Sequence, residues 1–203
     1  MIPIFVVLGV VALCLVGYGL FSGRRNTAAV QAAQLRPLAE DDLRALSDEI
    51  NRLGQGPESA NERVAALECE SRARRLLEEA QKPSDMLGVS SAIASGYHAV
   101  ACGRARVAGQ EWPPERALCF FDPAHGRSVR DVSWTPPGLG LRNVPACAAC
   151  ASAAEHGLEP SPRRVRVDGH TMAYWDAPSW YGSWAAGYFG SPRVLYAGLP
   201  IGR

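Results

Sequence analysis

The chain has 203 residues, with 21 Lys and Arg against 20 Asp and Glu and a formal net charge of +1. This length accommodates one or two small domains, and the near-neutral charge argues against a dedicated nucleic-acid-binding protein. The sequence has no Walker or dinucleotide-binding fingerprint, no Ser-His-Asp order and no paired carboxylates in a catalytic setting. These absences favour a protein that is not an enzyme.

An apolar segment near the N-terminus predicts a membrane anchor. Residues 2–21 contain no charged side chain, and twenty helical residues cover about 30 Å, the hydrocarbon thickness of a bilayer. Arg24 and Arg25 follow this segment, which favours a retained transmembrane helix over 1–23 rather than a cleaved signal. By the positive-inside rule, we expect a single-pass protein of the plasma membrane that contacts lipid through this helix, with its N-terminus outside and the bulk of the chain in the cytoplasm.

Three helices are predicted after the anchor. Because Pro37 disfavours helix at the residue before it, the first of them is expected over 38–53. Its first turns carry acidic residues that interact favourably with the helix dipole, namely Glu40, Asp41 and Asp42. Apolar and small residues at helical spacing predict the other two helices, over 59–81 and 84–107. We expect the three to form a short antiparallel bundle.

Four residues in the last third of the chain have the spacing of ligands to one metal ion. They are Cys119, His125, Cys147 and Cys150. Three thiols and an imidazole are a usual donor set for structural zinc. Between the two pairs, residues 127–144 predict a β-hairpin, and a helix is expected to begin at Cys147. This order of knuckle, hairpin and helix resembles a treble-clef zinc finger, so we predict a zinc site here.

Other interpretations compete with that zinc site. The thiols could be small buried residues without a metal, and Asp122 or His156 could replace one of the four ligands. On the oxidising side of a membrane, a disulfide between Cys119 and Cys147 or between Cys147 and Cys150 would compete. A Cys-x-x-Cys pair at the start of a helix is also typical of a thiol-disulfide oxidoreductase, which here would be tethered to the membrane.

Two features after the cysteines concern the surface. Asp168-Gly169 between alternating segments predicts a second β-hairpin. Its first strand places Arg164 and Arg166 on one face, where they could contact phosphate of lipid headgroups or nucleic acid, although a solvated strand face is the plainer interpretation. The tail of residues 179–203 carries aromatic residues at helical spacing, which could complete the core, meet a partner or sit at a membrane interface: Trp180, Trp184 and Tyr188.

Several strings in the sequence resemble segments of actinobacterial single-pass membrane proteins to which no function is assigned. These strings are CFFDPAHG, DVSWTPPG, VPACAAC and YWDAPSWYGSWAAGYF. The resemblance covers the last half of the chain best and the helical half loosely. It implies an anchor followed by a compact module, and it implies neither an activity nor a ligand set.

Together these patterns predict an α+β fold with an N-terminal transmembrane helix, a short antiparallel helical bundle and a small β-hairpin-rich module resembling a treble-clef zinc finger. The predicted segments are an anchor (1–23), a stalk (24–37), a bundle (38–109), a linker (110–117), the Cys/His module (118–178) and an aromatic tail (179–203). The predicted function is a membrane-anchored interaction or scaffold protein with structural zinc and a protein partner. The alternative is the membrane-tethered oxidoreductase, and nucleic acid is not expected as a partner.

Overall fold

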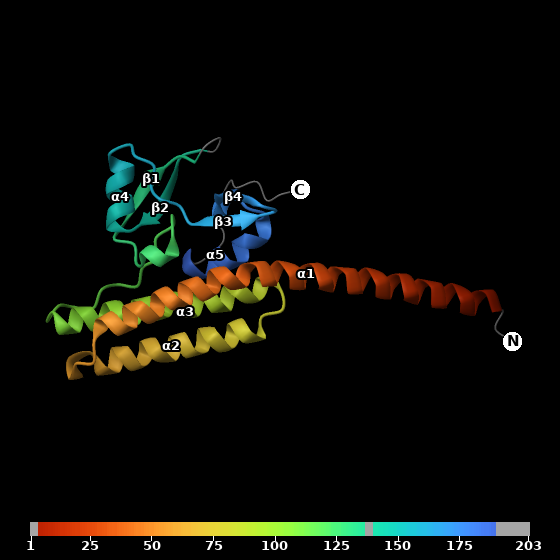
Figure 1. Ribbon diagram of the computed structural model, residues 1–203, viewed down its shortest axis with the longest axis horizontal. Helices are drawn as coiled ribbons and strands as arrows, with labels where there is room; N and C mark the ends of the chain where they lie inside the picture. The colour runs from red at the N-terminus through yellow and green to blue at the C-terminus, as the bar shows by residue number, and fades with distance from the viewer. Residues whose placement is uncertain (1–3, 137–139, 190–203) are drawn as a thin grey trace.

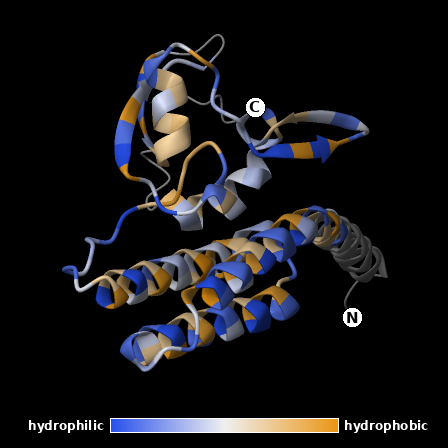
Figure 2. Cartoon of the chain, turned by 60° about the vertical axis from the view of Figure 1, so that its left-hand side comes forward, coloured by the Kyte–Doolittle hydropathy of each residue, from blue (hydrophilic) through white to orange (hydrophobic). Residues whose placement is uncertain are grey.

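A computed structural model describes the backbone of residues 4–136 and 140–189, and the side chains of residues 26–136 and 140–189. Within these ranges the chain forms five α-helices and two separate two-stranded sheets (Figure 1). The three long helices lie side by side in both views, and the sheets and the two short helices lie together on one side of them (Figure 2).

The three long helices form an antiparallel bundle. Helix α1 spans Ile4–Leu53, α2 spans Ala60–Glu79 and α3 spans Met86–Val107. The turns between them contain the short 3₁₀ segments Pro57–Ser59 and Pro83–Asp85. The helices share one apolar core, to which α1 contributes Leu35, Leu38, Ala39, Leu43, Leu46 and Ile50.

Small residues let α3 approach its neighbours closely. A Cβ on Gly96 would lie 2.7 Å from Leu46 Cδ2, and a Cβ on Gly103 would lie 2.8 Å from Leu53 Cδ2. Glycine in a helix interior costs about 1 kcal/mol relative to alanine. Close contact between α3 and the leucines of α1 offsets that cost, because a Cβ at either position would force a leucine side chain to shift.

The predicted membrane anchor is wrong. Among the helices of the described chain, none combines the length and the apolarity that crossing a bilayer requires. This finding overturns the transmembrane helix of residues 1–23, and with it the plasma-membrane location, the topology and the lipid contact. The anchor was expected to end near Arg24 and Arg25 and a new helix to begin after Pro37, but α1 is one helix that contains all three residues. Buried residues on both sides of the proline hold the helix together despite its missing hydrogen bond.

The first sheet and the helix after it lie where the sequence predicted a hairpin and a helix. Strand β1 (Arg130–Trp134) pairs antiparallel with β2 (Arg142–Ala146), and Val132 faces Val144 across the pair. Both valines are buried. Helix α4 (Ala148–Glu155) follows β2 and packs against β1. The hairpin therefore has one face covered by α4 and its other face open to solvent.

The second sheet confirms the hairpin predicted from Asp168-Gly169. Strand β3 (Arg164–Val167) pairs antiparallel with β4 (His170–Ala173). The two turn residues have φ angles of +48° and +83°, as a two-residue type I′ turn requires. Aspartate tolerates this left-handed region better than most residues, and glycine adopts it freely.

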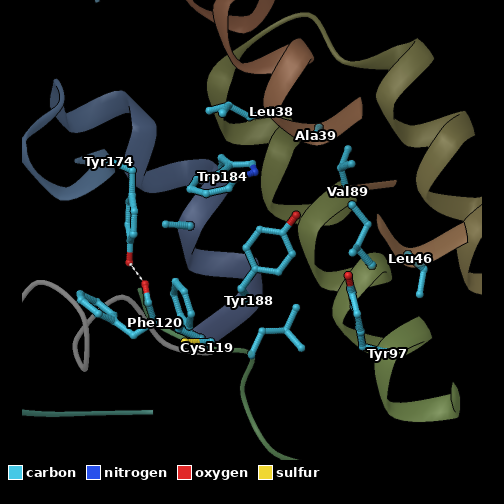
Figure 3. Close-up of a cluster of buried hydrophobic side chains, with 14 of the residues drawn as sticks. Leu38, Ala39, Leu46, Val89, Tyr97, Cys119, Phe120, Tyr174, Trp184 and Tyr188 are labelled. Atoms are coloured by element: carbon cyan, nitrogen blue, oxygen red, sulfur yellow. Dashed lines mark hydrogen bonds between the residues drawn. The ribbon is translucent and has the colours of Figure 1, made fainter. Parts of the chain in front are cut away.

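The last described helix completes the core. Helix α5 (Gly182–Phe189) packs against α3, and Trp184 and Tyr188 are 0% and 2% exposed. In Figure 3 both side chains project from α5 toward the long helices. The aromatic residues of the predicted tail therefore belong to the core as far as Phe189. Residues 190–203 of that tail lie outside the described residues.

The fold is thus helical with two small sheets, and its parts share one core. A single cluster of buried residues runs from the long helices through α5 to the Cys/His region. The predicted series of membrane helix, bundle and hairpin-rich module is wrong in its first element, because none of the helices in the described chain could span a membrane. Helix α5 packs against α3 and contributes to the same core as the Cys/His region.

Gly187 permits the contact between α5 and α3. A Cβ there would lie 2.6 Å from the Ser91 backbone nitrogen and 2.7 Å from the Leu87 carbonyl oxygen. We expect Gly187→Ala to lower the free energy of unfolding by about 1–3 kcal/mol in urea denaturation, because backbone atoms cannot move aside cheaply. The control is Gly88→Ala, where the new Cβ would meet only Leu76 Cδ1 at 3.5 Å. This variant should match the wild type or exceed its stability by up to about 1 kcal/mol; equal stability of the two variants would contradict the prediction.

Candidate metal centre

Cys119 and His125 lie near the two ends of a closed loop. A β-bridge between Leu118 and Arg127 closes the loop, and Cys119 N donates a hydrogen bond to Gly126 O at 2.8 Å. The loop is too short to rearrange without breaking these bonds. It therefore presents the thiol and the imidazole together.

Asp122 shapes the turn that carries His125. Its Oδ1 accepts a hydrogen bond from Ala124 N at 2.9 Å and so caps the 3₁₀ turn η3 (Pro123–His125). Aspartate is a favoured residue at such a position, because its side chain satisfies a backbone donor that the turn leaves free. The imidazole is thus positioned by a carboxylate three residues earlier in the chain.

Cys147 and Cys150 lie at the start of α4. Cys147 is the N-cap residue, and its Sγ accepts a hydrogen bond from Cys150 N at 3.5 Å. The loop with the first pair is tied to this region by a hydrogen bond from Phe120 N to Pro145 O at 2.8 Å. Since Pro145 lies in β2 two residues before Cys147, this bond holds the two cysteine pairs beside one another.

The four predicted site residues converge on one point. One ligand atom from each lies within 4.8 Å of the other three, and Cys150 Sγ lies 3.4 Å from His125 Nδ1. Around a tetrahedral zinc ion the ligand atoms lie roughly 3.5–3.8 Å apart. A contraction of the cluster by about 1 Å would reach that spacing. The structure therefore brings Cys119, His125, Cys147 and Cys150 into a cluster that could hold a metal ion.

The thiols of the cluster are buried and its imidazole is exposed. Cys119, Cys147 and Cys150 are 0%, 9% and 3% exposed. Burial raises the pKa of Cys119, and burial together with the neighbouring thiols raises the pKa of Cys150. A metal must therefore displace protons from these thiols when it binds. His125, in contrast, is exposed and lines a cleft of about 590 Å³ beside α3.

Other candidate ligands lie outside the cluster. His156 Nδ1 lies 2.8 Å from Ser152 O at the exposed end of α4, and the Asp122 carboxylate belongs to the turn. In α3, Cys102 Sγ lies 3.6 Å from His98 Nε2, and no third ligand joins this pair in the described chain. The five described cysteines are free thiols, so neither of the disulfides considered from the sequence is formed.

Arg164 and Arg166 lie apart from the metal cluster. Both are exposed on β3 and alternate with Val165, which is buried. The two guanidinium groups therefore occupy the solvent face of the strand, as the strand pattern indicates. Their contact with phosphate stays a prediction.

A buried carboxylate joins α1 to the metal-binding region. Asp42 is 1% exposed and accepts hydrogen bonds from Trp184 Nε1 at 2.9 Å and from Tyr188 Oη at 2.6 Å. Arg163 forms an ion pair with Asp42. The Nε atom of Arg163 also lies 3.1 Å from Asp122 Oδ1, in an ion pair that lacks hydrogen-bond geometry. We call Asp42, Arg163 and Asp122 the buried triad.

The sequence pattern does not indicate this triad. Asp42 is expected in the first turns of a helix, and no pattern in the sequence pairs it with Arg163. Because α1 continues through Pro37, Asp42 instead lies in the helix interior, four residues after Leu38 and four before Leu46. Residues with that spacing share one helix face. A charged residue within an apolar stripe is the signal that could have identified it, since such residues are rarely buried without a partner.

Comparison with protein families, with curated proteins and with solved structures finds no match to the chain. A functional conclusion must therefore be drawn from the cluster and its surroundings.

The buried triad predicts a pH dependence of stability. Burial raises the pKa of Asp42 from 3.8 to about 6, although Arg163 and the hydrogen bonds from Tyr188 and Trp184 oppose this. The folded protein then binds the proton more tightly than the unfolded chain, so this contribution to stability is full below about pH 4 and is lost as the pH rises through 6. Its full size is about 3 kcal/mol, of which about 1.5 kcal/mol falls between pH 5 and 8.

Urea denaturation of the wild type and of Asp42→Asn between pH 5 and 8 measures this effect. The difference in unfolding free energy between the two proteins should change across this range in favour of the wild type at low pH. Other titrating groups are common to both proteins and cancel in the difference. The matched control is Asp41→Asn, at a partly exposed neighbour, which should follow the wild type. A constant difference between wild type and Asp42→Asn would refute the raised pKa.

Proposed function

We propose that the protein is a non-enzymatic interaction or scaffold protein in which zinc, bound by Cys119, His125, Cys147 and Cys150, has a structural role. The observation that carries this proposal is the convergence of three thiols and one imidazole, from two separate segments of chain, within 4.8 Å. Thiolate-rich sets of this kind favour zinc over magnesium or calcium, which prefer oxygen ligands.

The donor set supports a structural rather than a catalytic metal. Structural zinc sites are closed by four protein ligands, whereas catalytic sites have three and keep a position open for water or substrate. Here four side chains are available, and three of them are buried. A zinc ion bound by all four would cross-link the loop of Cys119 to the start of α4. It would leave the surface of the protein, rather than the metal, to make functional contacts.

The local structure indicates that this cross-link would stabilise the region around the cluster. The loop with Cys119, the first hairpin and α4 contain short elements and few large aliphatic side chains. Small regions of this kind usually need a disulfide or a metal for stability. Zinc contributes about 10–16 kcal/mol of apparent folding free energy in small zinc modules at neutral pH, and here it would add to the aromatic core that this region shares with α5.

Metal analysis tests the zinc site directly. The purified wild type should contain one zinc ion per chain, and Cys147→Ser should lose most of it, because a hydroxyl is a poor replacement for a thiolate ligand. Replacement of zinc by cobalt should give thiolate-to-metal charge-transfer absorption in the wild type that Cys147→Ser lacks. Cys69→Ser removes a cysteine of α2 outside the cluster and is the matched control; it should retain full zinc. A wild type that binds zinc no better than Cys147→Ser would contradict the site.

A thiol-disulfide oxidoreductase is the second candidate function. The observation that favours it is the position of Cys147 at the N-cap of α4, where a thiolate is stabilised by the helix end. The third thiol and the imidazole beside the pair support the zinc site instead, because a redox pair needs neither.

Alkylation kinetics separate these two functions. For structural zinc, we expect the thiols of Cys119, Cys147 and Cys150 to react slowly with iodoacetamide at pH 7 until a chelator removes the metal, after which three further thiols per chain react. Cys69 should react at the same rate with and without the chelator. Rapid reaction of one thiol in the zinc-loaded protein, together with reduction of a disulfide substrate, would support the oxidoreductase.

A further inference from the structure

We infer that the buried triad of Asp42, Arg163 and Asp122 positions the first pair of ligands, so that the helical bundle sets the metal affinity of the Cys/His cluster. Asp42 and Arg163 would then be positioning residues for a metal that neither of them contacts. This inference rests on the proposed zinc site and adds to it a route by which the bundle controls the site.

The route begins in α1 and ends at a ligand. The Asp42 carboxylate holds the guanidinium of Arg163. Arg163 in turn lies against Asp122 at 3.1 Å, and Asp122 caps the turn that ends at His125. Each step is a contact between charged groups or between a carboxylate and a backbone donor. The Asp42 end of the route is buried, whereas Asp122 is partly exposed.

A second contact runs along the same route. The backbone nitrogen of Arg163 donates a hydrogen bond to Phe121 O at 2.7 Å. Phe121 is fully buried and lies two residues after Cys119. Arg163 therefore contacts the ligand loop at two adjacent residues, through its main chain at Phe121 and through its side chain at Asp122.

The orientation of Arg163 depends on Asp42. Burial lowers the pKa of Arg163, but Asp42 and Asp122 together outweigh burial and raise it, so the guanidinium stays charged between two carboxylates. Without Asp42, the side chain would lose the partner that holds it inside the molecule, and its cation would be drawn toward solvent or entirely toward Asp122. Either change would move the turn that presents the imidazole.

The expected effect is moderate because the loop has other restraints. The bond from Cys119 N to Gly126 O and the bond from Phe120 N to Pro145 O do not involve the triad. Groups that orient metal ligands from outside the coordination sphere typically alter metal affinity by about 10–100-fold. We therefore expect loss of one triad carboxylate to weaken zinc binding by about tenfold, without abolishing it.

Two variants of the full chain test the inference. Asp42→Asn removes the carboxylate in α1. Asp122→Asn removes the charge within the ligand loop, while its amide oxygen can still cap the turn. Zinc affinity is measured at pH 7.5 by competition with a chromophoric chelator. Both variants should bind zinc about tenfold more weakly than the wild type. The double variant should bind no more weakly than the weaker single variant, because both carboxylates act through Arg163.

Ile93→Val is the matched control for a general loss of stability. Ile93 is fully buried in α3 and is not a member of the triad, and its truncation costs about 1 kcal/mol. This control should leave zinc affinity and the cobalt spectrum unchanged, whereas Asp42→Asn should shift the cobalt bands. If Asp42→Asn does not fold, Asp122→Asn alone decides, since it lies at a partly exposed site.

The outcomes separate this inference from the proposed function. If the wild type binds no zinc, the proposed site fails, and the inference fails with it. If the wild type binds zinc but both asparagine variants bind it equally well, the site stands and the inference is overturned. Equal weakening in Ile93→Val would also overturn it, because metal affinity would then follow stability in general.

Discussion

The Asp42 carboxylate is buried, and it therefore needs hydrogen-bond donors and a cation beside it in the folded state. This need fixes α1, α5 and the residue before β3 relative to one another. Burying an unpaired carboxylate costs several kcal/mol, so its partners have to be present in the folded state. They come from α5, through Trp184 and Tyr188, and from the residue before β3, through Arg163. Segments more than a hundred residues apart in the sequence are thereby fixed on one face of α1.

Close packing of apolar residues also holds α5 against α3 and against the Cys/His region. Helix α5 can lie against α3 only because Gly187 leaves room for the α3 backbone. An aromatic ring of α5 then meets the Cys/His region, because Phe189 packs against Phe120. Phe120 also packs against Tyr174 and Trp175, which follow β4. The hydroxyl of Tyr174 donates a hydrogen bond to Phe120 O at 2.8 Å (Figure 3). The Cys/His region therefore has no core of its own and shares the aromatic core built around α5.

Local patterns in the sequence were sufficient to predict the hairpins, the helix after Cys147 and the candidate metal ligands. Turn chemistry at Asp168 and Gly169 predicted the second hairpin, and the spacing of the thiols and imidazole predicted a set of side chains that does converge. What the sequence could not supply was the tertiary context. An apolar N-terminal segment was taken for an anchor and Pro37 for a helix boundary, since neither pattern shows that α1 is one continuous helix. The burial of Asp42 was missed because its carboxylate was assigned to a helix start after Pro37, whereas α1 continues through Pro37 and Asp42 shares a face with Leu38 and Leu46.

Four consecutive residues show how these constraints meet at the candidate metal centre. Cys119 belongs to the metal cluster, and Phe120 to the aromatic core. The carbonyl of Phe121 accepts a hydrogen bond from Arg163, and the Asp122 carboxylate caps the turn of His125 beside the same arginine. Each residue thus engages a different part of the molecule. Because each of these residues is already ordered by the fold, the segment would lose little conformational entropy on binding a metal. The second pair lies at the start of α4, where the hydrogen bond from Phe120 N to Pro145 O holds it beside this segment. A metal bound by all four side chains would add a further link between α4 and the segment.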